Sequence, residues 1–281
     1  MGRLVQQPPP AGTHREHPAS RSRDKLLCGS GKIRHGRVTK INQPPANPAR
    51  FKGFSDTTSY SVSVAGDVTG DGIDDLLISA YGGDPGGRFD AGEVYLLSGA
   101  DLAALDIADG TADFVIQLAN INATGTSFRF NGIDAGDRAG LDVTGIGDVD
   151  NDGRQDLVIS APRSDPNGPD SGETYLISGA DLPALDAADG VVDGIIEIAN
   201  VAATGTSYQF NGETAGDNAG WSVSEVGDVD GDGLADLLIG APFSDAGGAD
   251  SGAVYFISGG DLAALDAADG TVDGIIGLEH V

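Results

Sequence analysis

The sequence predicts an all-β protein of three four-stranded β-propeller blades in an incomplete ring, preceded by a disordered N-terminal tail. A segment of the type GDVDGDGLADLLIGAP occurs three times, and its copies are 81 and 80 residues apart. A second marker, of the type SGADLAAL, recurs twice at a distance of 80 residues. Repeats of fixed period indicate an architecture of stacked, similar units. The first residues of the copies are Gly66, Gly147 and Gly227 for the segment and Ser98, Ser178 and Ser258 for the marker.

The residue pattern of each repeat predicts four short strands separated by polar turns. In the third repeat, the segment from Trp221 alternates apolar and polar residues, as a half-buried strand does. The runs DLLIGA, closed by Pro242, and AVYFISG are apolar and rich in β-branched or aromatic residues. The fourth strand corresponds to SFRFNG from Ser127 and SYQFNG from Ser207. Four such strands match one propeller blade, and we expect blades at about 51–132, 133–212 and 213–281.

An insert lies between the third and fourth strands of each repeat, for example ADLPALDAADGVVDGIIEIANV. Asp181 can cap a helical turn there and Gly190 can end it, so we expect a short surface helix.

The phase of the repeats at the two ends predicts an open ring. Residues 51–53 (FKG) match the FNG of the later fourth strands, and residues 278–281 align with residues 198–201, before the fourth strand of their repeat. About three blades are therefore present, whereas closed propellers typically use 4 to 8. We expect further blades from another chain or from a longer parent protein.

Charge divides the chain into two parts. The first 53 residues hold 11 Lys and Arg against two acids, and the rest holds five Arg, no Lys and 41 Asp and Glu. We expect residues 1–50, which are basic and rich in Pro, to be disordered because they cannot bury a core. The acidic array should repel nucleic acid and anionic lipid and attract cations. No apolar run approaches the roughly 20 residues of a membrane span, so we also expect no membrane insertion.

Each repeat contains a loop of the form Asp-x-Asp-x-Asp-Gly-x-x-Asp. Calcium prefers 6 to 8 oxygen ligands, and alternating carboxylates on a tight loop supply several of them. The Gly at position six lets the chain turn, the carbonyl at position seven can add a ligand, and the Asp at position nine closes the site. The candidate metal ligands are Asp67, Thr69, Asp71, Ile73 and Asp75 in the first loop, Asp148, Asp150, Asp152, Arg154 and Asp156 in the second, and Asp228, Asp230, Asp232, Leu234 and Asp236 in the third.

These loops differ from an EF-hand, which needs a bidentate Glu at position twelve and flanking helices. Position twelve is Ile78, Ile159 or Ile239, and the flanks predict strands, so we expect β-hairpin loops. Asp and Gly are also common in ordinary turns. Three loops with carboxylates at alternate positions favour metal, and we expect about one Ca²⁺ per repeat, up to three. Thr69 replaces an aspartate, so the first loop should bind most weakly.

The segment AGWSVSEVGDVDGDGLADLLIGAP, followed by GAVYFISG, resembles the FG-GAP repeat of integrin-α propellers and of many secreted bacterial proteins. The resemblance covers about residues 51–281. It implies calcium at the hairpin loops, an extracellular or cell-surface location, and adhesion or recognition of a protein or glycan ligand. Two departures are the pairs Ala139-Gly140 and Ala219-Gly220, where the family often has Phe-Gly. No signal peptide is visible in the chain, so the export route is not encoded in a recognisable form.

Residues 54–281 are poor in groups for acid–base or nucleophilic catalysis: their only histidine is His280, and they lack Cys and Lys. We therefore expect a binding module and not an enzyme. One alternative is a calcium-dependent, lectin-like carbohydrate-binding module using Trp221 with Tyr81 or Phe243, although the strand position of Trp221 favours blade packing. Another is a set of non-catalytic accessory repeats of a larger secreted hydrolase.

Overall fold

The structure, a computed structural model, describes residues 49–53, 58–123 and 125–281. It confirms an all-β fold of three antiparallel blades that do not close into a ring within the described residues. Blade 1 consists of β2 (Thr58–Gly66), β3 (Asp75–Ala80), β4 (Glu93–Leu97) and β6 (Phe128–Asn131). Blade 2 consists of β7 (Val143–Ile146), β8 (Asp156–Ala161), β9 (Glu173–Ile177) and β11 (Tyr208–Asn211). Blade 3 consists of β12 (Ser222–Gly227), β13 (Asp236–Ala241) and β14 (Ala253–Ile257).

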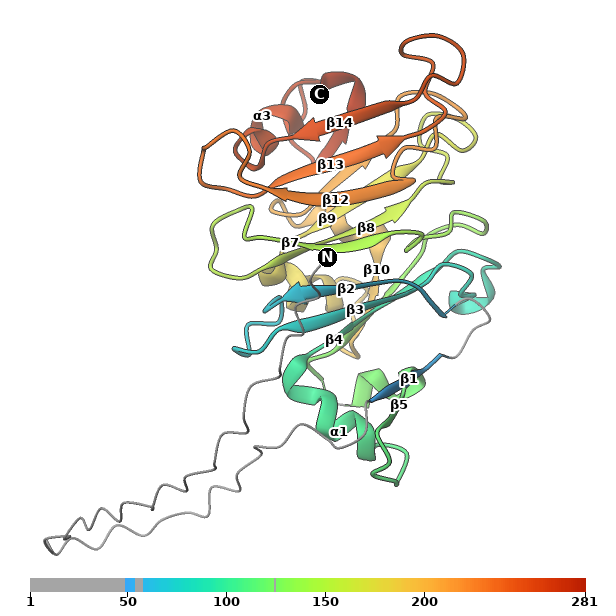
Figure 1. Ribbon diagram of the computed structural model, residues 1–281, viewed down its shortest axis with the longest axis vertical. Coiled ribbons are helices and arrows are strands. Elements are labelled where there is room, and N and C mark those ends of the chain that lie inside the picture. Colours follow the sequence, from blue (N-terminus) through green and yellow to red (C-terminus); the bar gives the residue numbers. More distant parts are fainter. Residues whose placement is uncertain (1–48, 54–57, 124) are drawn as a thin grey trace, which may run out of the picture. The chain divides into compact units, whose positions relative to one another are not determined.

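The blades stack face to face, and Figure 1 shows them following one another from β2 through β7 to β12. All six residues of β8 are buried because a neighbouring blade covers each face of the central sheet. Between blades 1 and 2, Val94 and Phe130 share a core with Tyr175. Between blades 2 and 3, Phe210 shares a core with Tyr255. These two clusters hold most of the buried apolar residues. Each fully buried aromatic or aliphatic side chain stabilises the fold by about 1.5–3 kcal/mol.

The inserts contain an extra strand that sequence patterns did not predict. The three extra strands are β5 (Val115–Gln117), β10 (Ile195–Glu197) and β15 (Ile275–Gly277). Each pairs in parallel with an outer strand that precedes its own blade: β5 with β1 (Arg50–Lys52), β10 with β6 and β15 with β11. The register is the same each time, with Phe51 opposite Ile116, Phe130 opposite Ile196 and Phe210 opposite Ile276. Each insert therefore links its own blade to the outer strand that precedes that blade in the chain.

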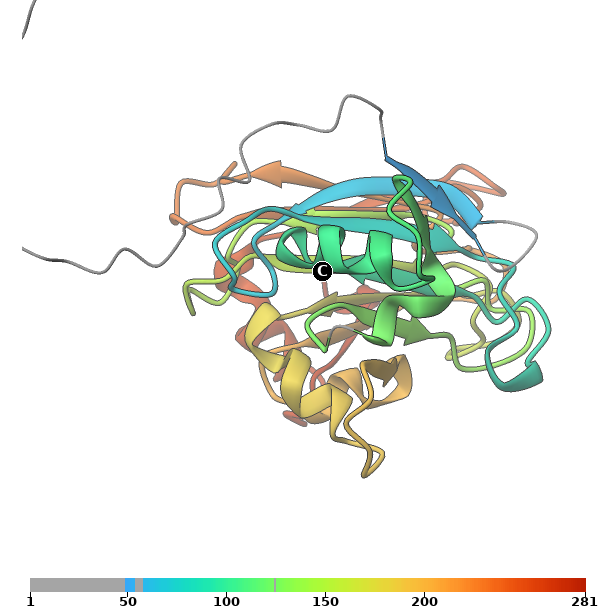
Figure 2. The ribbon, with the colours of Figure 1, turned by 90° about the horizontal axis from the view of Figure 1, so that it is seen from below.

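The predicted insert helices are present and short. They are α1 (Leu102–Ile107), α2 (Leu182–Asp186) and α3 (Leu262–Asp266). Short 3₁₀ helices span Pro85–Gly87, Gly99–Asp101, Leu118–Ala123, Gly179–Asp181, Ile198–Ala203, Gly259–Asp261 and Leu278–His280. In the end-on view of Figure 2, α2 lies on the opposite side of the array from β2.

The capping role expected for Asp181 is wrong. Its side chain caps no helix amide and instead accepts hydrogen bonds from Thr206 Oγ1 at 2.6 Å and Ser207 Oγ at 2.7 Å. The helix ends at Asp186, and Gly190 lies beyond it with a φ of +90°. Asp181 therefore links the start of the insert to the two residues that directly precede the outer strand β11.

The expected disorder of residues 1–50 falls almost entirely outside the described residues, and Arg50 belongs to β1. In the part of the chain that the structure describes, no helix is long and apolar enough to cross a membrane.

Candidate metal centres

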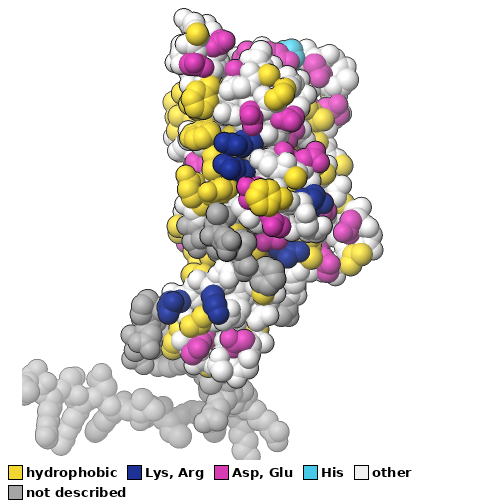
Figure 3. Space-filling model, turned by 90° about the vertical axis from the view of Figure 1, so that its right-hand side faces the viewer, with side chains coloured by type: hydrophobic (Ala, Val, Ile, Leu, Met, Phe, Trp, Pro, Cys, Tyr) yellow, Lys and Arg dark blue, Asp and Glu magenta, His cyan; other side chains and the backbone are white. Residues whose placement is uncertain are grey.

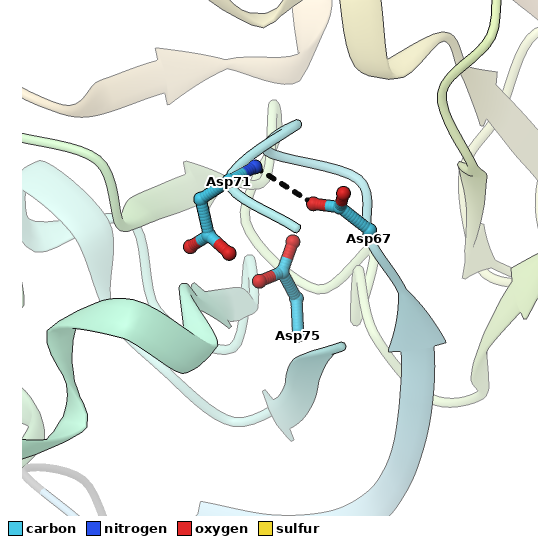
Figure 4. A group of neighbouring side chains, drawn as sticks. All are labelled: Asp67, Asp71 and Asp75. Atoms are coloured by element: carbon cyan, nitrogen blue, oxygen red, sulfur yellow. Dashed lines mark hydrogen bonds between the residues drawn. The ribbon is translucent and has the colours of Figure 1, made fainter. Parts of the chain in front are cut away.

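The three aspartate loops connect the first and second strands of each blade, between β2 and β3, β7 and β8, and β12 and β13. These strands pair antiparallel, so the loops are hairpin connections as predicted and have no flanking helices. Figure 4 shows Asp67, Asp71 and Asp75 of the first loop pointing toward a common space.

The aspartate at position one organises the turn. Asp67 accepts hydrogen bonds from the amides of Asp71 at 2.8 Å and Gly72 at 2.9 Å. Asp148 does the same for Asp152 and Gly153, at 3.0 and 2.8 Å. Gly72 and Gly153 have φ values of +87° and +93°, a region that disfavours residues with a Cβ.

The aspartate at position nine fastens the loop to the insert that follows the third strand. Asp156 is fully buried and accepts hydrogen bonds from the amides of Val149 at 2.8 Å and Gly179 at 3.0 Å. Asp236 makes the same two contacts with the amides of Val229 and Gly259. Asp75 makes similar contacts with the amides of Gly99 and Thr69, the latter one position further along the loop than Val149 and Val229. These bonds are made by protein groups alone, and they orient the carboxylate toward the loop without requiring an ion.

In each loop, three carboxylates have oxygens within 4.8 Å of one another. The second and third loops bring together positions one, three and nine, and the first brings together positions one, five and nine because Thr69 occupies position three. The three groups are Asp67, Asp71 and Asp75; Asp148, Asp150 and Asp156; and Asp228, Asp230 and Asp236.

Two of the aspartates predicted as ligands lie outside these groups. The side chains of Asp152 and Asp232 accept hydrogen bonds from the hydroxyls of Ser178 and Ser258, both at 3.1 Å. In the first loop, Asp71 accepts a similar bond from Ser98 and still belongs to the carboxylate group. The three serines begin the repeated SGADLAAL marker, and its spacing of 26 or 27 residues from the position-five aspartate was the available signal for their role.

The residues at position seven differ in where their side chains go. Arg154 extends from the second loop toward the first, where its Nη1 donates to the carbonyl oxygen of Thr69 at 3.3 Å and also to that of Gly179 at 3.3 Å. The carbonyl ligands expected from Ile73, Arg154 and Leu234 stay a prediction.

Electrostatics in the loops favour a cation. Burial raises the pKa of Asp156 to about 7, and the carboxylates of Asp150 and Asp152 add to the rise. Burial likewise raises the pKa of Asp75 and Asp150. Among the described residues, the ion pairs within 4 Å join Arg88 to Glu197, Arg129 to Glu93, Arg138 to Asp90 and His280 to Glu279. None of these pairs neutralises a loop carboxylate.

Asp71 behaves differently from its neighbours. Burial raises its pKa, but hydrogen bonds from the Ser98 hydroxyl and the amides of Ile73 and Ala100 outweigh that effect, and the pKa is lowered. This carboxylate is therefore readily ionised in the loop that lacks an aspartate at position three.

The donor set fits calcium. Each group consists of carboxylate oxygens, without sulfur or imidazole, and hard oxygen ligands suit Ca²⁺ better than zinc or copper. Acidic side chains are spread among hydrophobic and basic ones over the face shown in Figure 3.

Comparisons with known proteins point to one family. A family model described as FG-GAP repeat matches residues 59–97, 141–177 and 219–257. These segments contain the three aspartate loops with the strands on both sides of each.

Three integrin α chains are similar to this chain. Integrin alpha-PS5 of Drosophila melanogaster is 26% identical over 187 residues, which cover 66% of this chain and 15% of that protein. Integrin alpha-PS2 of the same species is 29% identical over 192 residues, covering 66% and 11%. Integrin alpha-4 of Xenopus laevis is 26% identical over 190 residues, covering 65% and 14%. The matched region is therefore a small part of each relative's length.

Proposed function

The chain is an FG-GAP repeat protein similar to integrin α chains, and we propose that it is a calcium-binding β-propeller segment of an extracellular protein that mediates adhesion or ligand binding. The observation that carries the proposal is the repeated group of three converging carboxylates, present in every blade at the same hairpin. A single acidic turn would be ordinary, but three such groups, none of which forms an ion pair within 4 Å among the described residues, favour a shared divalent ion.

In this proposal the ion is structural. Calcium, when bound, supplies positive charge that offsets the repulsion among the loop carboxylates. The protein supplies the orientation: Asp156 is held by the amides of Val149 and Gly179, and Asp148 by those of Asp152 and Gly153. An ion in this loop therefore connects the first hairpin of the blade to the insert behind its third strand.

Equilibrium dialysis with radioactive calcium tests the ion binding directly. We expect up to three ions per chain, and about one fewer in the double variant D148N/D150N. The matched control is D189N/D193N, which changes two exposed acids in the insert of the same blade. Equal loss in both double variants would show that calcium responds to total charge and not to the loop.

The adhesion role requires a separate experiment. The immobilised chain should retain extracellular matrix proteins in calcium and release them in chelator, and the D148N/D150N variant should retain less. Binding that ignores both calcium and the variant would contradict a calcium-dependent recognition surface. Location outside the cell follows from the same proposal and can be checked by protease accessibility on intact cells.

One observation favours the lectin-like alternative. Trp221 and Phe243 are about two-fifths exposed and contact each other edge to face, with ring centroids 5.9 Å apart. Exposed aromatic faces suit stacking on sugar rings. Tyr81 is less suitable because Tyr60 and Arg138 already lie against its ring. A glycan array probed with the wild type and W221A, with and without calcium, distinguishes a sugar ligand from a protein ligand.

A further inference from the structure

The first and second aspartate loops contact each other directly, although they belong to different blades. The backbone amide of Gln155 in the second loop donates to the carbonyl oxygen of Asp67 in the first at 3.3 Å. The guanidinium of Arg154 donates to the carbonyl oxygen of Thr69, also at 3.3 Å. A Cβ at Gly66 would come within 2.7 Å of the Gln155 side chain, so the loops are packed closely together. Two hydrogen bonds thus join two candidate metal sites.

The insert of blade 2 takes part in the same contact. The Nη1 of Arg154 also donates to the carbonyl oxygen of Gly179 at 3.3 Å, and the Gly179 amide donates to Asp156 at 3.0 Å. A Cβ at Gly179 would come within 2.6 Å of the carbonyl oxygen of Val68, which is fully buried in the core between blades 1 and 2. A continuous series of contacts therefore connects the carboxylate group of the second loop with the backbone of the first.

These contacts involve residues that hold or adjoin the candidate ligands. Arg154 and Gln155 occupy positions seven and eight of the second loop, and Asp156 of the carboxylate group follows them directly. An ion bound to this group would restrict the backbone of both residues. Asp67 and Thr69 accept their bonds from the second loop with backbone carbonyls, so the Asp67 carboxylate still points to the common space in Figure 4. The second loop therefore holds the backbone of the first and leaves its ligand side chains available.

The second and third loops are packed together without this polar link. A Cβ at Gly147 would come within 2.9 Å of the Ala235 methyl group, which is a contact between apolar atoms. Leu234 stands where the second loop has Arg154. Within the residues that the structure covers, no hydrogen bond joins the second loop to the third. The contact between the first two loops is therefore chemically different from the next one.

We propose that calcium binding in the second loop orders the first loop through Arg154 and Gln155, so that these two sites form a coupled pair without the third. This coupling rests on the calcium binding proposed above. When an ion restricts the second loop, the first loop loses conformational freedom before it binds an ion of its own. Linkage makes the effect reciprocal, so an ion in the first loop orders the second as well.

The pairing joins the weakest candidate site to a complete one. Thr69 leaves the first loop one carboxylate short, whereas the second loop has aspartates at positions one, three, five and nine. Ordering by the second loop lowers the entropy that the first loop must lose on binding, and so offsets part of this deficit.

Hydrogen–deuterium exchange of the full chain, measured on peptides from each loop, tests the coupling. The reporter is the double variant D67N/D71N, whose first loop loses two of its three grouped carboxylates and so no longer binds an ion. Saturating calcium should slow exchange in this disabled loop about fivefold, because the occupied second loop holds it. Adding R154L, which copies the natural Leu234, should remove most of that protection. Saturation keeps the effect of the Arg154 charge on affinity out of the readout.

The matched control is D228N/D230N, which disables the third loop in the same way beside an occupied second loop. Calcium should leave exchange in that disabled loop unchanged. Equal protection of both disabled loops would overturn the coupling, because calcium would then act on the chain as a whole. Protection that persists undiminished with R154L would overturn the role of the Arg154 contacts.

The wild type separates failure of the coupling from failure of calcium binding. Calcium should slow exchange in its second and third loops, which bind their own ions. If these loops are protected and the disabled first loop is not, only the coupling is overturned. If no loop is protected, calcium binding is overturned with it. Strand peptides that exchange as in the wild type show that each variant is folded, and the single variant D71N, at an exposed position, replaces a double variant that is not.

Discussion

The Asp156 carboxylate accepts a hydrogen bond from the Gly179 amide at 3.0 Å, which joins two residues that are 23 positions apart in the chain. The same contact links Asp75 to Gly99 and Asp236 to Gly259. Each loop is thus hydrogen-bonded to the insert of its own blade. A substitution in the loop should therefore change the stability of the whole blade.

Asp156 and Asp150 should affect stability differently. In chelator, D156A leaves the buried amides of Val149 and Gly179 without an acceptor, which should cost about 2–4 kcal/mol of unfolding free energy. D150A removes a bond to the Asp152 amide and a side-chain hydrogen bond with Ser178, leaves no fully buried amide without an acceptor, and should cost less than about 1 kcal/mol. Urea unfolding of both variants measures this, and equal losses would rule out a structural role specific to position nine.

Thr69 should limit the first loop. T69D restores a carboxylate at position three, and one added carboxylate should strengthen calcium binding there about tenfold, which is close to 1.4 kcal/mol. Calorimetric titration should then show three sites of similar affinity. T111D, which adds the same charge at an exposed residue of the insert, should leave the weak site unchanged. An identical gain in both variants would mean that net charge, and not loop geometry, sets the affinity.

Arg154 should weaken calcium binding in the neighbouring loop. Its guanidinium donates to the Thr69 carbonyl, so a positive charge lies beside the first carboxylate group. R154L, which copies the natural Leu234, should raise the affinity of the first loop about two- to tenfold at low salt, with a smaller gain at high salt. Titration of the chain at two ionic strengths measures the effect. Unchanged affinity at low salt would contradict the electrostatic explanation.

Asp137 should make stability depend on pH. Burial raises its pKa to about 6, and the carboxylates of Asp134, Glu173 and Asp165 add to the rise. Because the folded state favours the neutral acid, this group costs no stability below about pH 4 and destabilises the fold progressively as pH rises through 6.

The substitution D137N removes this cost. It should raise unfolding free energy by about 1–3 kcal/mol above pH 7, and the gain over the wild type should vanish near pH 4. Thermal melts across this range measure it, with D189N as an exposed control that should show no such trend. A gain that stays constant with pH would point to packing instead of ionisation.

Local patterns predicted the blades and the loops because their signals are contiguous. The alternation from Trp221 and the apolar run before Pro242 identify β12 and β13, and the Asp-Gly spacing identifies the hairpin between them. The strand β10 was not predicted, because IIE is short and its partner β6 lies more than sixty residues earlier in a parallel arrangement. Pairing of that kind leaves no local period in a sequence.

The details of the site could not be predicted from the sequence for the same reason, because they depend on contacts between segments that are far apart in the chain. Alternating aspartates indicate a cation loop, but they do not reveal that Asp152 turns to Ser178 while Asp150 joins the group. That choice depends on a serine contributed by a segment beyond the third strand. Likewise, the path of Arg154 to Thr69 depends on how blade 2 stacks on blade 1.

The central claim is that the three carboxylate groups bind calcium and that the blades depend on it. Calorimetric titration combined with melting in calcium and in chelator tests it most directly. With an affinity of about 0.1 mM, millimolar calcium contributes about 1.4 kcal/mol per site, so chelator should lower the melting temperature by roughly 10 °C. A chain that releases no heat with calcium and melts at the same temperature in chelator would contradict the account.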